Sequence, residues 1–121
     1  MNEISYIRRR LLPDIEGHFG QREISLLTGP RQAGKTTLMR RIETLLKAQG
    51  RKTLWLNLDF EDDARHLSSQ GALLQKVRLE LGSDGGVVFI DEIQRKQDAG
   101  LFLKGLYDQG LPWKFVEIGQ T

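Results

Sequence analysis

The octapeptide at positions 29–36 reads Gly29-Pro30-Arg31-Gln32-Ala33-Gly34-Lys35-Thr36. It matches the phosphate-binding pattern GxxxxGK[ST] at every fixed position. The residues before it, 23–28, predict a short strand with apolar members. The residues after it predict a helix, because apolar side chains recur at helical spacing: Leu38, Met39, Ile42, Leu45 and Leu46. This order of strand, loop and helix is the context in which a phosphate-binding loop occurs.

The residue types of this loop explain how it would hold phosphate. Gly29 and Gly34 allow a tight turn that brings backbone N–H groups close to an anion. The helix beginning near Lys35 directs its positive dipole end at the same place. Lys35 is expected to reach the β- and γ-phosphates, and the Thr36 hydroxyl to be one ligand of a bridging Mg²⁺. With Thr37, residues 29–37 form the predicted nucleotide-binding segment.

A second motif follows at 87–92, which reads VVFIDE. Four consecutive apolar residues predict a strand buried on both faces, as in a parallel sheet. Ligands of such sheets bind at the carboxyl ends of the strands, where Asp91 and Glu92 stand. Asp91 is therefore placed to hold Mg²⁺, directly or through water, opposite Thr36. Glu92 is placed to orient and deprotonate a water that attacks the γ-phosphate.

The other segments complete an alternation of strands and helices. Strands are predicted over 53–60 and 114–118, and helices over 64–81, with a break at Gly71, and over 98–109, capped by Asp98. In the last helix we expect four buried side chains: Phe102, Leu103, Leu106 and Tyr107. The acidic run at 61–63 either binds a metal or opens the helix that follows, and the second use is the commoner.

Composition sets further bounds. A chain of 121 residues predicts one domain. The absence of cysteine excludes disulfides and thiolate metal sites. No apolar run is long enough for a membrane span, so a cytoplasmic location is the default expectation. The net charge of +2 is too small to indicate a nucleic-acid partner. Residues 1–20 predict a helical lead-in, in which Arg8 to Arg10 form a solvated face rather than a nucleic-acid contact.

The two motifs together resemble the AAA-type ATPases. The wording GPRQAGKTTL, VVFIDEIQR and a later LK-containing helix is similar to one bacterial and archaeal branch of ATP-binding proteins, usually followed by a C-terminal domain of unknown function. The resemblance covers about Arg8 to Thr121. It implies a three-layer α/β/α P-loop NTPase core with a mainly parallel sheet, within a single domain at 21–121. It also implies Mg²⁺-ATP as ligand, with Lys35 and Glu92 as catalytic residues and Thr36 and Asp91 as metal ligands.

Several positions depart from this family or have no defined role in it. After the fourth strand the family usually shows Thr-Gly-Ser-Ser, whereas residues 118–121 read Ile-Gly-Gln-Thr, which leaves Gln120 as the candidate sensor of the γ-phosphate. Arg95 either senses phosphate, contacts a neighbouring subunit or forms a surface ion pair. The family's sheet order is 5-1-4-3-2, and we expect the core to be truncated after its fourth strand. The phosphate-loop strand would then be an unpaired edge through which the chain self-associates.

The function expected from these residues is Mg²⁺-dependent ATP binding and hydrolysis. The alternative is a nucleotide-dependent switch or binding module with little intrinsic hydrolysis. The phosphate loop argues against a purely structural protein. A GTPase has little support, because no Asn-Lys-x-Asp motif occurs, and small-molecule kinases usually carry arginines on a lid. The protein partner and the process that hydrolysis would drive are not indicated by the sequence.

Overall fold

The computed structural model describes residues 24–27 and 34–119, with side chains from Thr37 onward. Its centre is a four-stranded sheet in the order β1-β4-β3-β2, and every neighbouring pair is parallel. The strands are β1 (Ile24–Leu27), β2 (Thr53–Asn57), β3 (Gly86–Asp91) and β4 (Trp113–Ile118). This order is the 1-4-3-2 portion of the expected arrangement. The α/β P-loop fold predicted from the sequence is therefore confirmed, while the helical lead-in at 1–20 lies outside the described residues.

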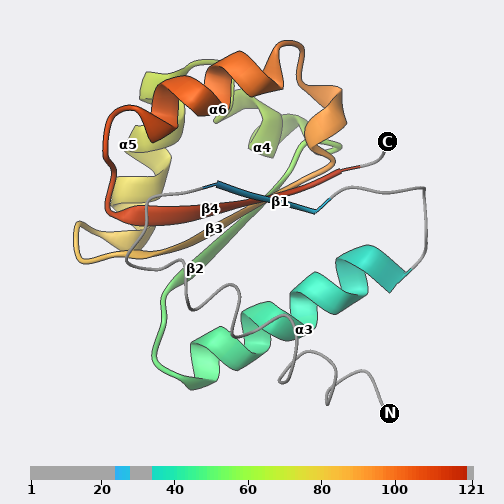
Figure 1. The fold of residues 1–121 in the computed structure, drawn as a ribbon, viewed down its shortest axis with the longest axis vertical. Helices are drawn as coiled ribbons and strands as arrows, with labels where there is room; N and C mark the ends of the chain where they lie inside the picture. The colour runs from blue at the N-terminus through green and yellow to red at the C-terminus, as the bar shows by residue number, and fades with distance from the viewer. Residues whose placement is uncertain (1–23, 28–33, 120–121) are drawn as a thin grey trace.

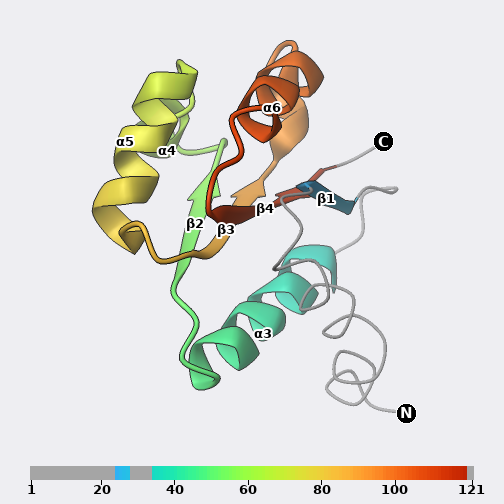
Figure 2. The ribbon, with the colours of Figure 1, turned by 60° about the vertical axis from the view of Figure 1, so that its left-hand side comes forward.

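Helices cover both faces of the sheet (Figures 1 and 2). One face carries α3 (Gly34–Ala48) alone among the described helices, and the opposite face carries α4 (Glu61–Arg65), α5 (Gln70–Leu81) and α6 (Ala99–Tyr107). The structure thus has the three α/β/α layers predicted for the chain. Among its described helices, none has both the length and the apolar character needed to cross a membrane.

Each face of the sheet has its own apolar core. The α3 core combines residues of that helix with alternate residues of the two central strands: Met39, Ile42, Leu46, Val87, Phe89, Val116 and Ile118. The intervening strand residues, among them Val88, Ile90 and Phe115, pack against α5 and α6 instead. Because side chains alternate along a strand, the uninterrupted apolar sequence of β3 supplies both cores. This is the two-sided burial that its composition predicts.

The two tryptophans of the chain lie in different cores. Trp55 stacks on Phe89 with 5.0 Å between the ring centroids, and the guanidinium of Arg40 lies 3.9 Å above the Trp55 ring. This group belongs to the α3 side. Trp113 belongs to the α5–α6 side, where its Nε1 donates a hydrogen bond of 2.9 Å to the carbonyl oxygen of Gly82. Each tryptophan therefore joins a strand to the helical layer on its own face of the sheet.

The segment at 64–81 differs from the single helix expected there. The break lies at residues 66–69, between α4 and α5, whereas Gly71 is inside α5. Ser69 explains the new start, because its Oγ accepts a hydrogen bond of 3.0 Å from the N–H of Ala72, a favourable N-cap arrangement. The acidic run at 61–63 forms the first turn of α4, which is the helix-opening use of these residues.

Two expectations about the last helix are wrong. Asp98 has a left-handed backbone (φ 56°) and its side chain makes no capping hydrogen bond. Tyr107 is 46% exposed, because it is the final residue of α6 and the buried stripe of that helix runs through Leu103 and Leu106.

The strand β1 is an edge strand of the described sheet. Self-association through that edge stays a prediction.

Candidate functional site

The carboxyl ends of three strands meet at one edge of the sheet. Leu27, the last residue of β1, is level with Ile118 of β4. Ile90 of β3 is level with Glu117, so Asp91 is level with Ile118 and hence with Leu27. Neighbouring strands lie about 4.8 Å apart, which puts β1 and β3 roughly 10 Å apart across β4. The predicted loop leaves β1, and Asp91 and Glu92 leave β3, on the same edge of the sheet.

The phosphate loop itself lies largely outside the described residues, which exclude 28–33. The described part begins with Gly34, the first residue of α3. Lys35 and Thr36 are in the first turn of that helix, and the exposed Thr37 follows them. This agrees with a helix that begins at the phosphate loop, because the first four N–H groups of a helix have no partner within it. The helix is 15 residues long, so it carries a full macrodipole toward this end.

Asp91 lies on the face of the sheet that α3 covers. Its neighbours on alternate positions, Val87 and Phe89, pack in the α3 core, whereas Val88 and Ile90 pack on the opposite side. The side chain is only 2% exposed, and its Oδ1 accepts a hydrogen bond of 2.9 Å from the N–H of Glu92. A buried carboxylate on this face, at this edge, fits the metal-ligand position expected for it.

Glu92 occupies a sharp turn directly after the strand. Its backbone is left-handed, with φ 57° and ψ 43°, a region that few residues other than glycine and asparagine enter. Its carbonyl oxygen accepts the N–H of Arg95 at 3.0 Å, which opens the short helix η2 (Ile93–Arg95). Its half-buried carboxylate accepts a hydrogen bond of 2.6 Å from Nε2 of Gln94. Held left-handed residues of this kind occur often at functional sites.

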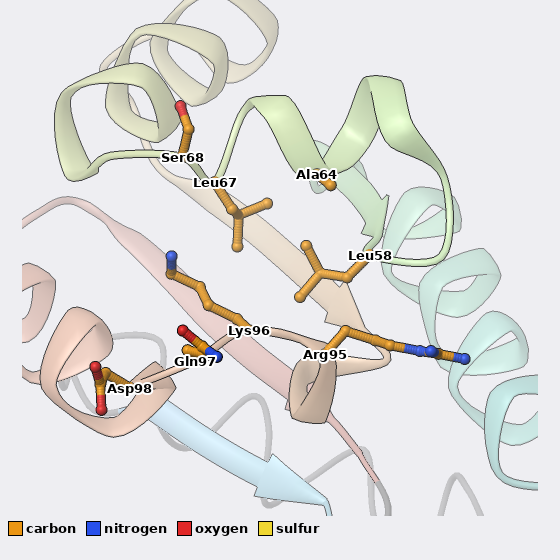
Figure 3. Close-up of a pocket in the computed structure, with 8 residues that line it drawn as sticks. All are labelled: Leu58, Ala64, Leu67, Ser68, Arg95, Lys96, Gln97 and Asp98. Carbon is orange, nitrogen blue, oxygen red and sulfur yellow. The ribbon is translucent and has the colours of Figure 1, made fainter.

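The residues after Glu92 lead away from the α3 face. The Nε of Arg95 lies 2.9 Å from Oδ1 of Asp59, with the two side chains 64% and 42% exposed. This is the surface ion pair among the roles considered for Arg95. Arg95 to Asp98 also line a pocket of roughly 440 Å³, together with Leu58, Ala64, Leu67 and Ser68. Figure 3 shows Leu58 and Leu67 pointing across that pocket toward the strand-to-helix segment that carries Lys96. The pocket lies beside α4, so it is separate from the face where Asp91 lies.

Sequence reasoning missed one buried carboxyl near this edge. Glu117 is 9% exposed, and it alternates with Val116 and Ile118, so it lies on the α5–α6 face, opposite to Asp91. Burial without compensating charge raises its pKa from 4.5 to about 7. The sequence could have predicted this burial, because Glu117 shares one face of the strand with Trp113 and Phe115, two large apolar residues that indicate a buried strand face.

Glu117 makes the stability of the domain depend on pH. Because its folded pKa of about 7 exceeds the unfolded value of 4.5, the folded state holds more protons, and stability falls as pH rises from 4.5 to 7. We expect Glu117→Gln to match the wild type near pH 4 and to be more stable near pH 8 by about 1–3 kcal/mol, since solvent screening reduces the effect of the full shift. Urea unfolding across this pH range measures the difference.

The control for this measurement is Glu61→Gln, which changes an exposed glutamate. Its stability difference from the wild type should stay within about 1 kcal/mol at every pH, because exposed charges contribute little. A Glu117→Gln variant whose difference from the wild type does not change with pH would show that Glu117 ionises as freely in the folded domain as in the unfolded chain.

Comparison with known proteins identifies the family of the domain. A protein-family model described as an AAA domain matches residues 21–120 of the chain. No curated protein matches it. The matched region contains β1, the loop before α3, the Asp91–Glu92 pair and β4, and the family supports nucleotide binding by a P-loop domain. The match covers nearly the whole chain, which therefore belongs to the AAA domain family.

Proposed function

We propose that the domain binds ATP with Mg²⁺ and hydrolyses the terminal phosphate. The observation that carries this proposal is the position of Asp91. It is a buried carboxylate on the α3 face, at the sheet edge from which the loop before α3 also leaves. The sequence motif predicts a phosphate-binding loop after β1, and the strand register brings the end of β3, with its two acids, to the same edge of the sheet as the end of β1. An acidic pair and an anion-binding loop at one edge fit a ligand that is both polyanionic and metal-bound.

Phosphate binding is assigned to residues 29–37. The backbone N–H groups of the loop and of the first turn of α3 would cradle the β-phosphate, as unpaired N–H groups at a helix N-terminus favour anions. Lys35 would neutralise charge on the β- and γ-phosphates. The residues at this helix end include no acid in the first turn, so no carboxylate of α3 opposes the phosphate there.

The residues proposed to hold Mg²⁺ are Thr36 and Asp91. A hydroxyl and a carboxylate are oxygen donors, which Mg²⁺ prefers, and this ion is commonly held by one or two protein groups together with phosphates and water. Oδ1 of Asp91 accepts a hydrogen bond from the N–H of Glu92, and this bond fixes the orientation of the carboxylate. When bound, the ion would neutralise charge that develops on the phosphates.

Glu92 is the proposed general base. It follows Asp91 directly, and its left-handed backbone turns the chain away from the strand direction. Its half-buried carboxylate would accept a proton from a water molecule that attacks the γ-phosphate. Asp91 and Glu92 are thus assigned separate tasks. The strand fixes Asp91 on the α3 face, and Glu92 lies in the turn that follows the strand.

Nucleotide titration and phosphate release test the proposal. We expect the purified chain to bind ATP in the presence of Mg²⁺ and to release phosphate, and we expect release to fall to background when EDTA removes the metal. A parallel titration with GTP establishes the base preference. Tight binding without phosphate release would favour a nucleotide-dependent switch. Absence of binding to either nucleotide would contradict the proposal.

A further inference from the structure

Gln94 makes the shortest side-chain contact to the proposed base. Its Nε2 donates a hydrogen bond of 2.6 Å to Oε2 of Glu92, two residues earlier in the chain. A hydrogen bond to an ionised acceptor is stronger than one between neutral groups. Gln94 itself is exposed, so apolar burial does not account for the position of its side chain. The carboxylate of Glu92 is a physical reason for that position.

The hydrogen bond completes a set of restraints on Glu92. Its N–H is held by Oδ1 of Asp91, and its carbonyl oxygen is held by the N–H of Arg95. With Oε2 held by Gln94, both the backbone and one carboxylate oxygen are fixed. A carboxylate that is oriented through one of its oxygens presents the other in a defined direction, which suits a group that accepts a proton from water.

The end of β4 determines where Gln94 can lie. Gly119 is the buried residue that follows this strand. A Cβ atom at Gly119 would come within 2.6 Å of Cγ2 of Ile93 and 3.2 Å of Oε1 of Gln94. The backbone of Gly119 therefore packs closely against η2 and against the amide of Gln94. This contact joins the end of β4 to the segment that follows β3. Because β4 lies between β1 and β3, the contact is close to the ends of both strands that form the proposed site.

We infer that Gln94 is a positioning residue for hydrolysis, which directs the carboxylate of Glu92 through its amide and is itself seated against Gly119. The inference rests on the proposed function of Glu92 as general base. It assigns to Gln94 an effect on turnover rather than on nucleotide binding, because its amide donates a hydrogen bond to the proposed base. It also gives the hydrogen bond a direction of effect: removing it lowers the rate.

Steady-state kinetics of three variants test this inference. Gln94→Ala removes the donor, and Gln94→Glu keeps the side-chain shape while replacing the donor by a second carboxylate. We expect both to lower kcat by 10- to 100-fold, with a Kd for ATP within threefold of the wild type. The matched control is Gln97→Ala, an exposed glutamine of the same segment, which should leave kcat within twofold. Unchanged urea midpoints in all three would show that the fold is intact.

Two results would overturn the inference. A kcat within twofold of the wild type in Gln94→Ala would show that the contact has no role in turnover. A raised kcat would show that Gln94 restrains the base instead of directing it. If the wild type itself releases no phosphate, the proposed function fails. Whether Gln94 donates a hydrogen bond to Glu92 is then decided by the NMR signal of the side-chain amide of Gln94. A shifted Nε2–H signal that is lost in Glu92→Ala supports the hydrogen bond, and an unshifted signal refutes it.

Discussion

Lys35→Ala is expected to abolish nucleotide binding. Lys35 belongs to the first turn of α3, the end of the helix that favours anions. One charge pair at about 4 Å near a protein surface is worth on the order of 4 kcal/mol before desolvation is subtracted. We therefore expect the Kd for Mg²⁺-ATP to rise by at least about a hundredfold, which corresponds to roughly 2.7 kcal/mol. Isothermal titration calorimetry measures this change.

The control for this experiment is on the same helix. Lys47 lies in the last turn of α3, with a side chain that is 60% exposed and 3.9 Å from Glu43. Lys47→Ala removes an equal charge at the far end of the helix, and the Kd should stay within about twofold because exposed charges at such a distance are screened by salt. Equal losses of affinity in both variants would indicate a general electrostatic effect and would contradict a specific role for Lys35.

Glu92→Gln is expected to separate binding from turnover. Glutamine has almost the shape of glutamate but cannot accept a proton from water, and general-base catalysis typically contributes about 10²- to 10⁴-fold. The rate of phosphate release should fall by a factor in that range, whereas the Kd for ATP should remain within a few-fold of the wild type. Single-turnover measurement with radiolabelled ATP distinguishes the loss of chemistry from slow product release.

Glu80→Gln provides the matched comparison for this second variant. Glu80 is a partly exposed residue of α5 that pairs with Lys76 at 2.9 Å, so the same chemical change is made away from the proposed site. Its rate should equal that of the wild type. If Glu92→Gln also retained its rate, Glu92 would not be the base, and the water would have to be activated by another group. If the wild type and both variants released no phosphate, a nucleotide-dependent switch would describe the domain better.

The sequence was sufficient for the sheet and for the strand that ends in Asp91. A four-residue apolar run that ends in acids predicts a buried parallel strand, and β3 has this form, with Asp91 as its last residue. Strand order followed from the family resemblance, and the observed order β1-β4-β3-β2 agrees with it. The prediction of β3 succeeds because it depends on local pattern and on burial, which a sequence expresses directly, whereas the strand order depended on the family resemblance.

Other features depend on contacts that a linear pattern does not express. The sequence offers two signals near the helix break at 66–69: Ser69, which can cap a helix, and Gly71, which can interrupt one. In the structure Ser69 caps α5, and Gly71 lies inside that helix. The contact of Gln94 with Glu92 is made beside the left-handed turn at Glu92, and a glutamate does not predict such a turn, because few residues other than glycine and asparagine enter that region. The raised pKa of Glu117 requires knowledge of both faces of β4.

The separation of Trp55 and Trp113 gives the domain one intrinsic fluorophore in each helical layer. Trp55 contacts Phe89 and Arg40, so a change in the layer of α3, the helix that begins at the proposed phosphate site, would alter the surroundings of this indole. Trp113 senses the opposite layer through its bond to Gly82. The surroundings of each indole therefore belong to the helical layer on its own side of the sheet.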